Sequence, residues 1–353
     1  MNILYEALRK EGIPPPLKNT ETYRIVRWGH NNRYWLKKFD GGYVFGDFVD
    51  GLSKHVFEKA YKGQMLTEAQ SRMQQARKEA EIDQAKAHEK ASVKAMEIWS
   101  QATPMLNHPY LVKKKVQSHG LKSDNDGKII IPAYDESGKI WTLQYVFETV
   151  NKDEQKEFIK RFMPGGRKKG NFFVIGDIAS SDQLYICEGY ATGASIYECT
   201  NIPVVVAFDT SNLQIVAEKI CNKYRDAKIV ICADNDQFHD SGVNAGLDAA
   251  KEAARAIGAS VVKPEFRDLC KKPTDFNDLL REEGTEAVKS SLGKLEKLEL
   301  SDFELTNEGL FYISGRTGKK IRISNYISVQ AFVKEKSGNI SRLVEFKDYQ
   351  NRA

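Results

Sequence analysis

Hydrophobic and polar positions divide the chain into zones with different periodicities. Short aromatic and β-branched runs at residues 22–28, 33–39 and 42–49 are separated by Gly and Asn, which predicts an antiparallel meander. From about Thr67 to Trp99 the chain is rich in Ala, Glu, Lys, Gln and Arg and lacks Gly and Pro, which predicts one long polar helix. We interpret this helix as a connector or a lid, with a plain solvated spacer as the alternative.

The second half of the chain alternates between strand and helix patterns. Two apolar runs around an Asp135–Gly138 turn predict a β-hairpin over residues 128–147. Further apolar runs alternate with helical segments: 184–187, 203–208, 228–234 and 259–264, with helices expected after Gly189, from Ser211 and from Ser241. This alternation predicts a parallel sheet covered by helices on both faces. Residues 301–353 return to antiparallel strand patterns and stop without an element that closes the sheet.

Composition narrows the class of protein. The 353 residues are 41% hydrophobic and 29% charged, which is typical of a soluble chain with several domains. The net charge of +5 allows an anionic partner without requiring one. The cysteines form no C-x-x-C pair and the histidines are scattered, so we expect no zinc and a reducing compartment. No signal peptide or apolar span of ~20 residues occurs, so we expect a cytoplasmic protein without a membrane partner.

Carboxylates follow two of the predicted parallel strands. Glu188 comes directly after the first strand, and Asp234 and Asp236 follow the strand that begins at Lys228. Ligands of open α/β sheets gather at the carboxyl ends of the strands, so these acids are expected to converge there. Carboxylates held together repel one another unless a cation neutralises them, and oxygen ligands suit Mg²⁺ or Mn²⁺. Each acid alone also fits an ordinary turn or helix cap, but their combination favours a metal site.

Glu188-Gly189 followed by Asp234-x-Asp236 on a parallel sheet resembles the Toprim domain of bacterial primases, topoisomerases and some nucleases. The resemblance implies that these three acids are catalytic and bind divalent metal where a phosphodiester bond is made or cut. Asp275 and Asp278, in "KPTDFNDLL", stand where bacterial-type primases carry a further acidic motif. This segment departs from the family's usual Asp-Pro-Asp, so the resemblance gives weaker support to these two residues as metal ligands.

Basic residues precede the acidic motifs. The hairpin at 128–147 and the segment 160–176 resemble the subdomain of bacterial-type primases that faces nucleotide and template. Glycines among the cations predict a flexible loop that can approach phosphates closely, with a solvated turn as the alternative. The predicted nucleotide- and DNA-binding residues are Lys160, Arg161, Arg167, Lys168 and Lys169, together with Lys113 and Lys114, for which a solvated face is an equal alternative.

Both ends of the chain extend the resemblance. The N-terminal segment, with Gly-Asp-Phe at 46–48, resembles the opening domain of primases from phages, prophages and plasmids, which replaces a zinc module. Its cations interleave with rings such as Trp28 and Trp35, which can stack bases or simply form a sheet core. Residues 301–353 resemble the start of a domain that often precedes a helicase module. No Walker A motif occurs, so we expect the primase part of a longer primase-helicase or a variant without the motor.

The predicted architecture is an α/β chain built around a Toprim parallel sheet. Its parts are a β-rich domain (1–64), a helical connector (65–100), a basic α+β subdomain (101–178), the Toprim domain (179–296) and an incomplete β-rich segment (297–353). The resemblance implies a DNA primase that makes short RNA primers on single-stranded DNA from ribonucleoside triphosphates, for a mobile element. Two Mg²⁺ ions are the implied cofactors, and a replicative helicase is the implied partner. The alternatives are a Toprim nuclease and a non-catalytic single-stranded-DNA-binding replication factor.

Overall fold

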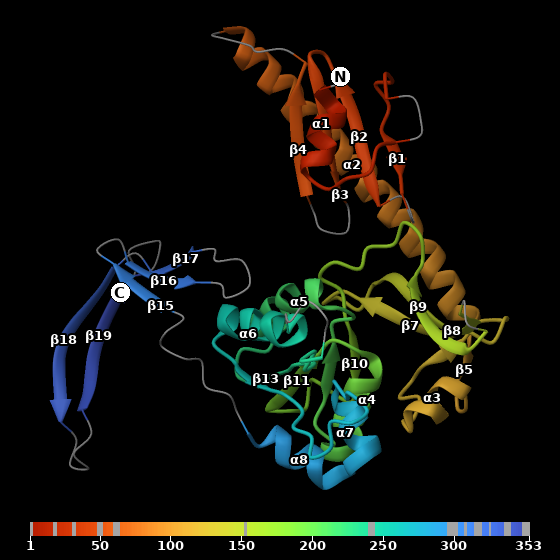
Figure 1. Ribbon diagram of the computed structural model, residues 1–353, viewed down its shortest axis with the longest axis vertical. Coiled ribbons are helices and arrows are strands. Elements are labelled where there is room, and N and C mark those ends of the chain that lie inside the picture. The colour runs from red at the N-terminus through yellow and green to blue at the C-terminus, as the bar shows by residue number, and fades with distance from the viewer. Residues whose placement is uncertain are drawn as a thin grey trace. The chain divides into compact units, whose positions relative to one another are not determined.

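The computed structural model divides into two compact units, Met1–Phe173 and Val174–Ala353, and each is described by itself (Figure 1). The structure describes residues 3–16, 20–29, 33–47, 52–58, 64–151, 154–238 and 244–294. Beyond these it describes the backbone of five strands between residues 303 and 347. Within the described helices, none is long and apolar enough to cross a membrane.

The first unit begins with a four-stranded antiparallel sheet in the order β1-β2-β3-β4. Its elements are α1 (Ile3–Lys10), β1 (Val26–Trp28), β2 (Tyr34–Phe39), β3 (Gly42–Asp47) and β4 (Leu52–Phe57). The predicted meander is confirmed, whereas α1 and the polar strand β4 were not predicted. Trp28 and Trp35 are only 8% and 6% exposed, and Trp28 Nε1 donates a hydrogen bond to the Pro14 carbonyl. These two rings therefore form sheet core rather than a surface for stacking bases.

The long helix α2 (Gln64–Gln101) takes part in two hydrophobic cores. Near its start, Met73 and Ala76 pack against buried residues of the N-terminal sheet. Near its end, Ala91 and Ala95 pack with buried residues of a second sheet, including Leu143. The helix is therefore not the solvated spacer that we considered, because its small residues allow a sheet to pack closely at each end.

The second sheet of the first unit has the order β5-β6-β7-β8-β9 and is antiparallel throughout. Its elements are β5 (Thr103–Pro104), α3 (Pro109–Lys114), β6 (Lys122–Ser123), β7 (Ile129–Tyr134), β8 (Ile140–Val150) and β9 (Lys156–Phe162). The hairpin expected over 128–147 is confirmed as β7 and β8. The unpredicted β9 pairs with the far edge of β8 and carries Lys160 and Arg161, which lie opposite Val146 and Tyr145.

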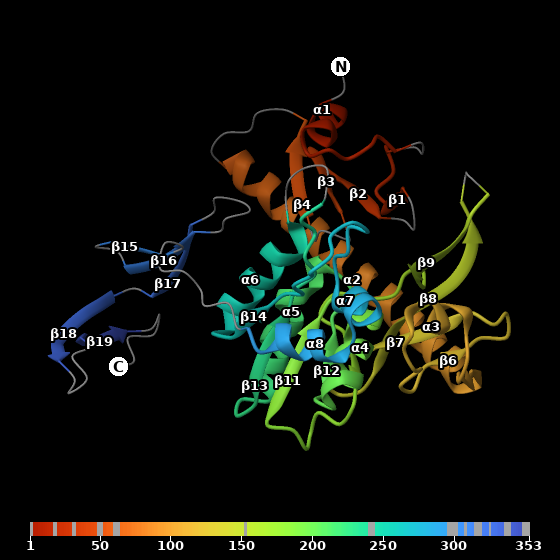
Figure 2. The ribbon, with the colours of Figure 1, turned by 60° about the horizontal axis from the view of Figure 1, so that its bottom comes forward.

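The second unit is built on a five-stranded sheet in the order β10-β12-β11-β13-β14 (Figure 2). The strands are β10 (Phe173–Ile175), β11 (Gln183–Cys187), β12 (Val204–Val206), β13 (Lys228–Cys232) and β14 (Ser260–Val262). The helices are α4 (Tyr190–Thr200), α5 (Thr210–Lys223), α6 (Ala245–Ile257), α7 (Phe276–Glu283) and α8 (Thr285–Leu292). Strands β12, β11, β13 and β14 pair in parallel. Helices α5 and α6 cover one face and α4, α7 and α8 the other, which confirms the predicted βα architecture.

One predicted helix boundary is wrong. Helix α6 begins at Ala245, not at Ser241, because Asn244 is its N-cap and accepts a hydrogen bond from the Leu247 amide. Residues 241–243 lie outside the described residues. The cap, rather than the first polar residue after the strand, determines where the helix starts.

The C-terminal strands form two further antiparallel sheets. The first contains β15 (Phe303–Thr306), β16 (Gly309–Ile313) and β17 (Lys320–Ser324), and the second pairs β18 (Tyr326–Lys334) with β19 (Ile340–Lys347). The antiparallel strand character predicted for residues 301–353 is therefore confirmed in the described strands. That these strands begin a larger, incomplete domain stays a prediction.

Candidate active site

The register of two central strands brings the first acids together. Strands β11 and β13 are neighbours, and Cys187 lies directly opposite Cys232 at their carboxyl ends. Glu188 follows Cys187 at once, and Asp234 comes two residues after Cys232. Both side chains are partly exposed at the same edge of the sheet. The register therefore places Glu188 and Asp234 at one edge of the sheet, and a shared metal between them stays a prediction.

Helix α4 can start immediately after Glu188 because of two glycines. Gly189 is its N-cap, and the Gly189 carbonyl accepts the first helical hydrogen bond from the Gly193 amide. A Cβ atom on Gly193 would lie 3.0 Å from Val206 Cγ2 and 3.1 Å from Cys187 Sγ. The helix thus lies close to the sheet, and a side chain at Gly193 would require the Val206 or Cys187 side chain to shift.

Asp236 is held by the start of helix α6. Its carboxylate Oδ2 accepts a hydrogen bond from the Gly246 amide at 3.1 Å, and its own amide donates to Asn244 Oδ1 at 2.9 Å. Asn244 Nδ2 in turn donates to Asn235 Oδ1 at 2.7 Å. Sequence reasoning missed Asn244 and Gly246, because the helix was predicted to begin four residues too early. An Asn followed two residues later by Gly was the signal of a capped, closely packed helix start.

A backbone hydrogen bond connects the segment that contains Asp275 and Asp278 to the loop that contains Asp234 and Asp236. The Asn235 amide donates a 2.7 Å hydrogen bond to the Thr274 carbonyl, so the loop after β13 lies beside the start of α7. Asp275 is the N-cap of α7 and accepts from the Asp278 amide at 2.7 Å. Asp278 accepts from the Thr274 amide at 3.1 Å and lies 3.4 Å from Arg281 Nη1. The structure thus brings Asp275 and Asp278 toward the other acids and also gives each a role at a helix start.

The pKa of the buried Cys187 thiol, at the end of β11, responds to the negative charge at this edge of the sheet. Burial raises the pKa of Cys187 well above its usual range, and the nearby Cys232, Asp234, Glu188 and Asp275 add to this effect. Among the described residues, however, no three His, Cys, Asp or Glu side chains form a ready-made metal cluster. The negative charge is thus gathered at this edge of the sheet.

The part of the chain that carries these acids matches a known domain family. Residues 183–286 match the Toprim domain family. The second unit contains a Toprim domain. The match begins at the first residue of β11 and ends within α8, so it includes all five predicted acids.

The similarity to known proteins is not confined to the Toprim domain. The chain is 36% identical over 286 residues to a DNA primase TraC of Escherichia coli, covering 74% of this chain and 26% of that protein. A second DNA primase TraC of Escherichia coli is 35% identical over 204 residues, covering 53% of this chain and 14% of that protein. The chain thus spans about a quarter or less of the length of these curated relatives.

Solved structures with weaker overall likeness are also primases. A DNA primase domain from Pseudomonas aeruginosa has 18% identity and a TM-score of 0.35, over 57% of this chain and 59% of that chain. The zinc-binding and RNA polymerase domains of the Aquifex aeolicus primase have 15% identity and a TM-score of 0.35, over 79% of this chain and 82% of that chain.

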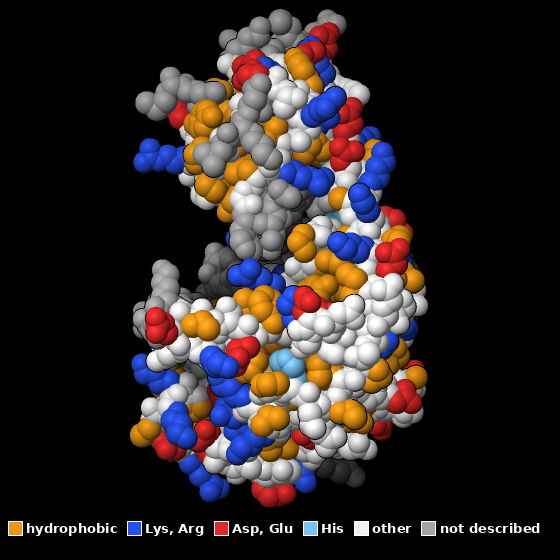
Figure 3. All heavy atoms as spheres, turned by 90° about the vertical axis from the view of Figure 1, so that its right-hand side faces the viewer, with side chains coloured by type: hydrophobic (Ala, Val, Ile, Leu, Met, Phe, Trp, Pro, Cys, Tyr) orange, Lys and Arg blue, Asp and Glu red, His pale blue; other side chains and the backbone are white. Residues whose placement is uncertain are grey.

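The predicted basic residues lie in the first unit, outside the Toprim domain. Lys160, Arg161, Lys169 and Lys113 are exposed, whereas Arg167, Lys168 and Lys114 are partly buried. Three of them lie over aromatic rings: Lys113 over Phe158 at 5.7 Å, Arg167 over Trp141 at 3.5 Å and Lys168 over Phe162 at 6.0 Å. Figure 3 shows Lys and Arg side chains scattered over the face that it draws. Several of them lie close together in the lower half of the view. Its contact with the Trp141 ring holds the Arg167 side chain, which differs from the flexible cationic loop that we predicted.

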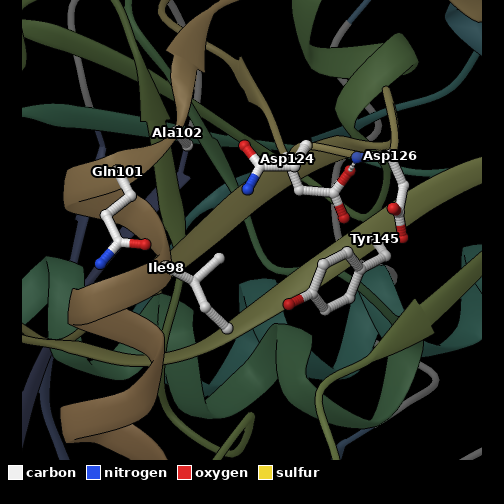
Figure 4. A pocket seen from close by; sticks show the side chains of 7 residues that line it. Ile98, Gln101, Ala102, Asp124, Asp126 and Tyr145 are labelled. Carbon is white, nitrogen blue, oxygen red and sulfur yellow. Dashed lines mark hydrogen bonds between the residues drawn. The ribbon is translucent and has the colours of Figure 1, made fainter.

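A hollow in the first unit is lined by other residues. It measures about 290 Å³ and lies between the end of α2 and the β6–β7 turn (Figure 4). Its lining includes Ile98, Gln101, Asp124 and Tyr145, and none of the predicted site residues. Asp124 Oδ1 accepts hydrogen bonds from the Asp126 and Lys128 amides of the same turn, which identifies it as a turn residue.

Proposed function

We propose that this protein is a DNA primase that makes short RNA primers on single-stranded DNA by metal-dependent nucleotidyl transfer. The observation that carries the proposal is the Cys187–Cys232 register, which brings Glu188 and Asp234 to one edge of the Toprim sheet. The 36% identity to a DNA primase TraC supports a primase over other Toprim enzymes. Replication of a mobile element is the biological setting that we propose.

The donor set fits a hard divalent cation. Glu188, Asp234 and Asp236 offer only carboxylate oxygens, which suit Mg²⁺ or Mn²⁺ rather than a thiophilic metal. Mg²⁺ is usually held by one or two carboxylates together with water and substrate phosphates, so a closed protein cage is not required. When bound, the metal would stabilise negative charge on the transferred phosphoryl group and activate the attacking hydroxyl. Asp275 and Asp278 are proposed as further ligands with weaker support.

The chain's own residues would do three things. The acids at the β11 and β13 ends would hold the metal, and the Gly246 amide would keep Asp236 oriented by donating to its Oδ2. Lys160, Arg161, Arg167, Lys168 and Lys169, with Lys113 and Lys114, would neutralise the triphosphate and the template backbone. No Ser, Cys or His nucleophile is needed, because the primer hydroxyl itself would attack the α-phosphorus of the nucleotide and pyrophosphate would leave.

The test is primer synthesis with labelled ribonucleotides, single-stranded DNA and Mg²⁺. Glu188→Gln and Asp234→Asn should each lower synthesis by roughly 100-fold or more, because such changes remove charge stabilisation at the reacting phosphate. Glu198→Gln, an exposed acid on helix α4, is the matched control and should keep full activity. Undiminished synthesis by either site variant would contradict the assignment.

The same incubation separates the alternatives. Shortening of the DNA instead of new primers would indicate a nuclease that uses the same acids. DNA binding that survives Glu188→Gln, with no synthesis or cleavage by the unaltered protein, would indicate a non-catalytic replication factor. A replicative helicase, fused or separate, is the proposed protein partner, and co-purification of helicase activity with the full chain would test it.

A further inference from the structure

Trp141, at the start of strand β8, is surrounded by charged groups. The guanidinium carbon of Arg167 lies 3.5 Å from the centre of the indole ring, and Lys139 Nζ lies 4.2 Å from it. The indole Nε1 donates a 2.6 Å hydrogen bond to Asp135 Oδ2. The ring is thus fixed along its edge by the hairpin turn and carries Arg167 on its surface.

The backbone around Arg167 is tied down on both sides. His88 of helix α2 donates from Nδ1 to the Gly165 carbonyl at 2.9 Å, and Asn171 Nδ2 donates to the Arg167 carbonyl at 2.6 Å. A Cβ atom on Gly166 would lie 2.1 Å from Thr142 Oγ1, so the loop packs directly on β8. With the backbone fixed, the direction of the guanidinium depends on what its side chain contacts.

Stacking orients the guanidinium without consuming its donors. A guanidinium that lies on an aromatic ring keeps all of its N–H groups in the guanidinium plane, where they can bind an anion in a two-pronged manner. Arg167 Nη2 lies 4.0 Å from Asp135 Oδ2, beyond hydrogen-bond distance, and its side chain is 35% exposed. Within the described part of the chain, Arg167 Nε is buried and donates no hydrogen bond, so a phosphate would reach the exposed part of the side chain. The structure therefore holds Arg167 with donors to spare.

We propose that Trp141 is a positioning residue that presents the Arg167 guanidinium to a phosphate group of the substrate. The inference rests on the proposed function and adds a residue that the sequence did not single out. The phosphate belongs either to the incoming nucleoside triphosphate or to the template backbone, and both offer the paired oxygens that a guanidinium binds. Two hydrogen bonds hold this part of the hairpin, from Trp141 Nε1 to Asp135 and from Ser92 Oγ of α2 to the Ile140 carbonyl.

The experiment uses the full chain with Trp141→Ala, Trp141→Phe, Arg167→Ala and Arg167→Lys. Trp99→Ala is the matched control, because Trp99 also carries a stacked cation, Lys122 at 4.6 Å, but lies outside the loop. Two affinities are measured, the KM for ribonucleotides in primer synthesis and the binding of a labelled oligonucleotide by anisotropy. Urea unfolding of each variant shows whether it is folded under the assay conditions.

Trp141→Ala and Arg167→Lys should each weaken one of the two affinities by roughly tenfold, the scale of a partly desolvated cation–π contact. Trp141→Phe should keep it within about threefold, because phenylalanine still offers a ring face, and kcat should change less than KM. A change confined to the nucleotide KM identifies the triphosphate as ligand, and one confined to the oligonucleotide identifies the template.

Two results would overturn the inference. If Arg167→Ala weakens binding while a folded Trp141→Ala variant matches the Trp99→Ala control, Trp141 has only a structural role and the proposed primase function still stands. If neither Arg167 variant changes either affinity, the guanidinium does not bind phosphate. Failure of the proposed function shows differently, as absence of primers from the unaltered protein, and the oligonucleotide arm still tests Trp141 in that case.

Discussion

Asp275 combines a role in helix formation with a place near the acids of the Toprim sheet. It accepts a hydrogen bond from the Asp278 amide as the N-cap of α7, and its charge adds to the effect of burial that raises the pKa of Cys187. An asparagine can still accept the capping hydrogen bond, but it lacks the charge that a metal ligand needs. The two roles can therefore be separated by substitution.

Asp275→Ala should lower the free energy of unfolding by about 1 kcal/mol, the usual cost of losing an N-cap, while Asp275→Asn should cost only a few tenths. If Asp275 also holds metal, Asp275→Asn should still reduce primer synthesis, by less than Glu188→Gln does. Urea unfolding and primer synthesis are measured on both variants. Full activity in a stable Asp275→Asn variant would leave only the capping role.

Asp135 links the hairpin turn to Trp141 and gives the fold a dependence on pH. Burial by itself would raise the pKa of Asp135, but hydrogen bonds from Ser137, Trp141 and Lys139 outweigh it and lower the pKa from 3.8 to about 2. A carboxyl group with a lowered pKa stabilises the fold fully above its unfolded pKa, and this contribution is lost as pH falls through the folded pKa. The affected window therefore runs from about pH 4 down to about pH 2.

Asp135→Asn should be less stable than the unaltered protein at pH 7, by an amount on the order of 2 kcal/mol. The difference should shrink as pH falls below 4, because protonation removes the same charge from the unaltered protein. Urea unfolding followed by circular dichroism at pH 7, 4 and 3 measures this difference. A difference that stays constant down to pH 3 would contradict the assigned cause of the shift.

At the scale of elements, the start of α6 determines where Asp236 points. A Cβ atom on Gly246 would lie 2.7 Å from the Asp234 carbonyl and 3.0 Å from Asp236 Oδ2. A backbone carbonyl cannot rotate away as a flexible side chain can, so any side chain at this position displaces the helix start or the acids. Glycine is needed here for space rather than for an unusual backbone angle.

Gly246→Ala should therefore reduce primer synthesis by roughly tenfold or more, since displacing catalytic groups by even ~1 Å can cost 100-fold. Alanine has a higher helix propensity than glycine, so the substitution should not weaken helix α6 itself. Ala245→Ser, at the neighbouring exposed position, is the control and should keep its activity. Full activity of Gly246→Ala would mean that the acids tolerate the shift and that Asp236 does not depend on α6.

At the scale of the whole molecule, the C-terminal strands are separable from the Toprim sheet in their pairing. The described strands β15 to β19 pair only among themselves, in a three-stranded and a two-stranded sheet. Helix α8, in contrast, contributes Val288 and Leu292 to the buried residues of the unit, at 0% and 6% exposure. Truncation after residue 300 should therefore leave the Toprim domain folded, whereas truncation before helix α8 should unfold it.

Removal of the residues after Leu300 should leave the Toprim domain folded and most primer synthesis intact. Removal of the residues after Gly284, which deletes α8, should unfold the domain, because it uncovers the apolar contacts between α8 and α4. Circular dichroism, limited proteolysis and primer synthesis compare the two truncations. Loss of synthesis by a folded protein ending at Leu300 would assign the C-terminal strands to the catalytic unit.

The sequence by itself determined the βα architecture of the second unit and the edge at which its acids meet. Short apolar runs that alternate with helical segments favour a parallel sheet covered on both faces, and parallel strands bring their carboxyl ends to the same edge. Glu188 and Asp234 could therefore be placed together without coordinates. The meander of the first unit followed in the same way from aromatic runs separated by turn residues.

Only the tertiary structure decided which polar groups hold those acids and cations in place. Asn244 and Gly246 support Asp236, and Trp141 carries Arg167, through contacts between residues that are far apart in the chain or hidden by an uncertain helix boundary. The long helix looked polar because most of its buried positions are small alanines, which pack against sheets and add little to its hydrophobicity. Periodicity reports which face of an element is apolar, whereas packing partners depend on the three-dimensional arrangement of all the elements.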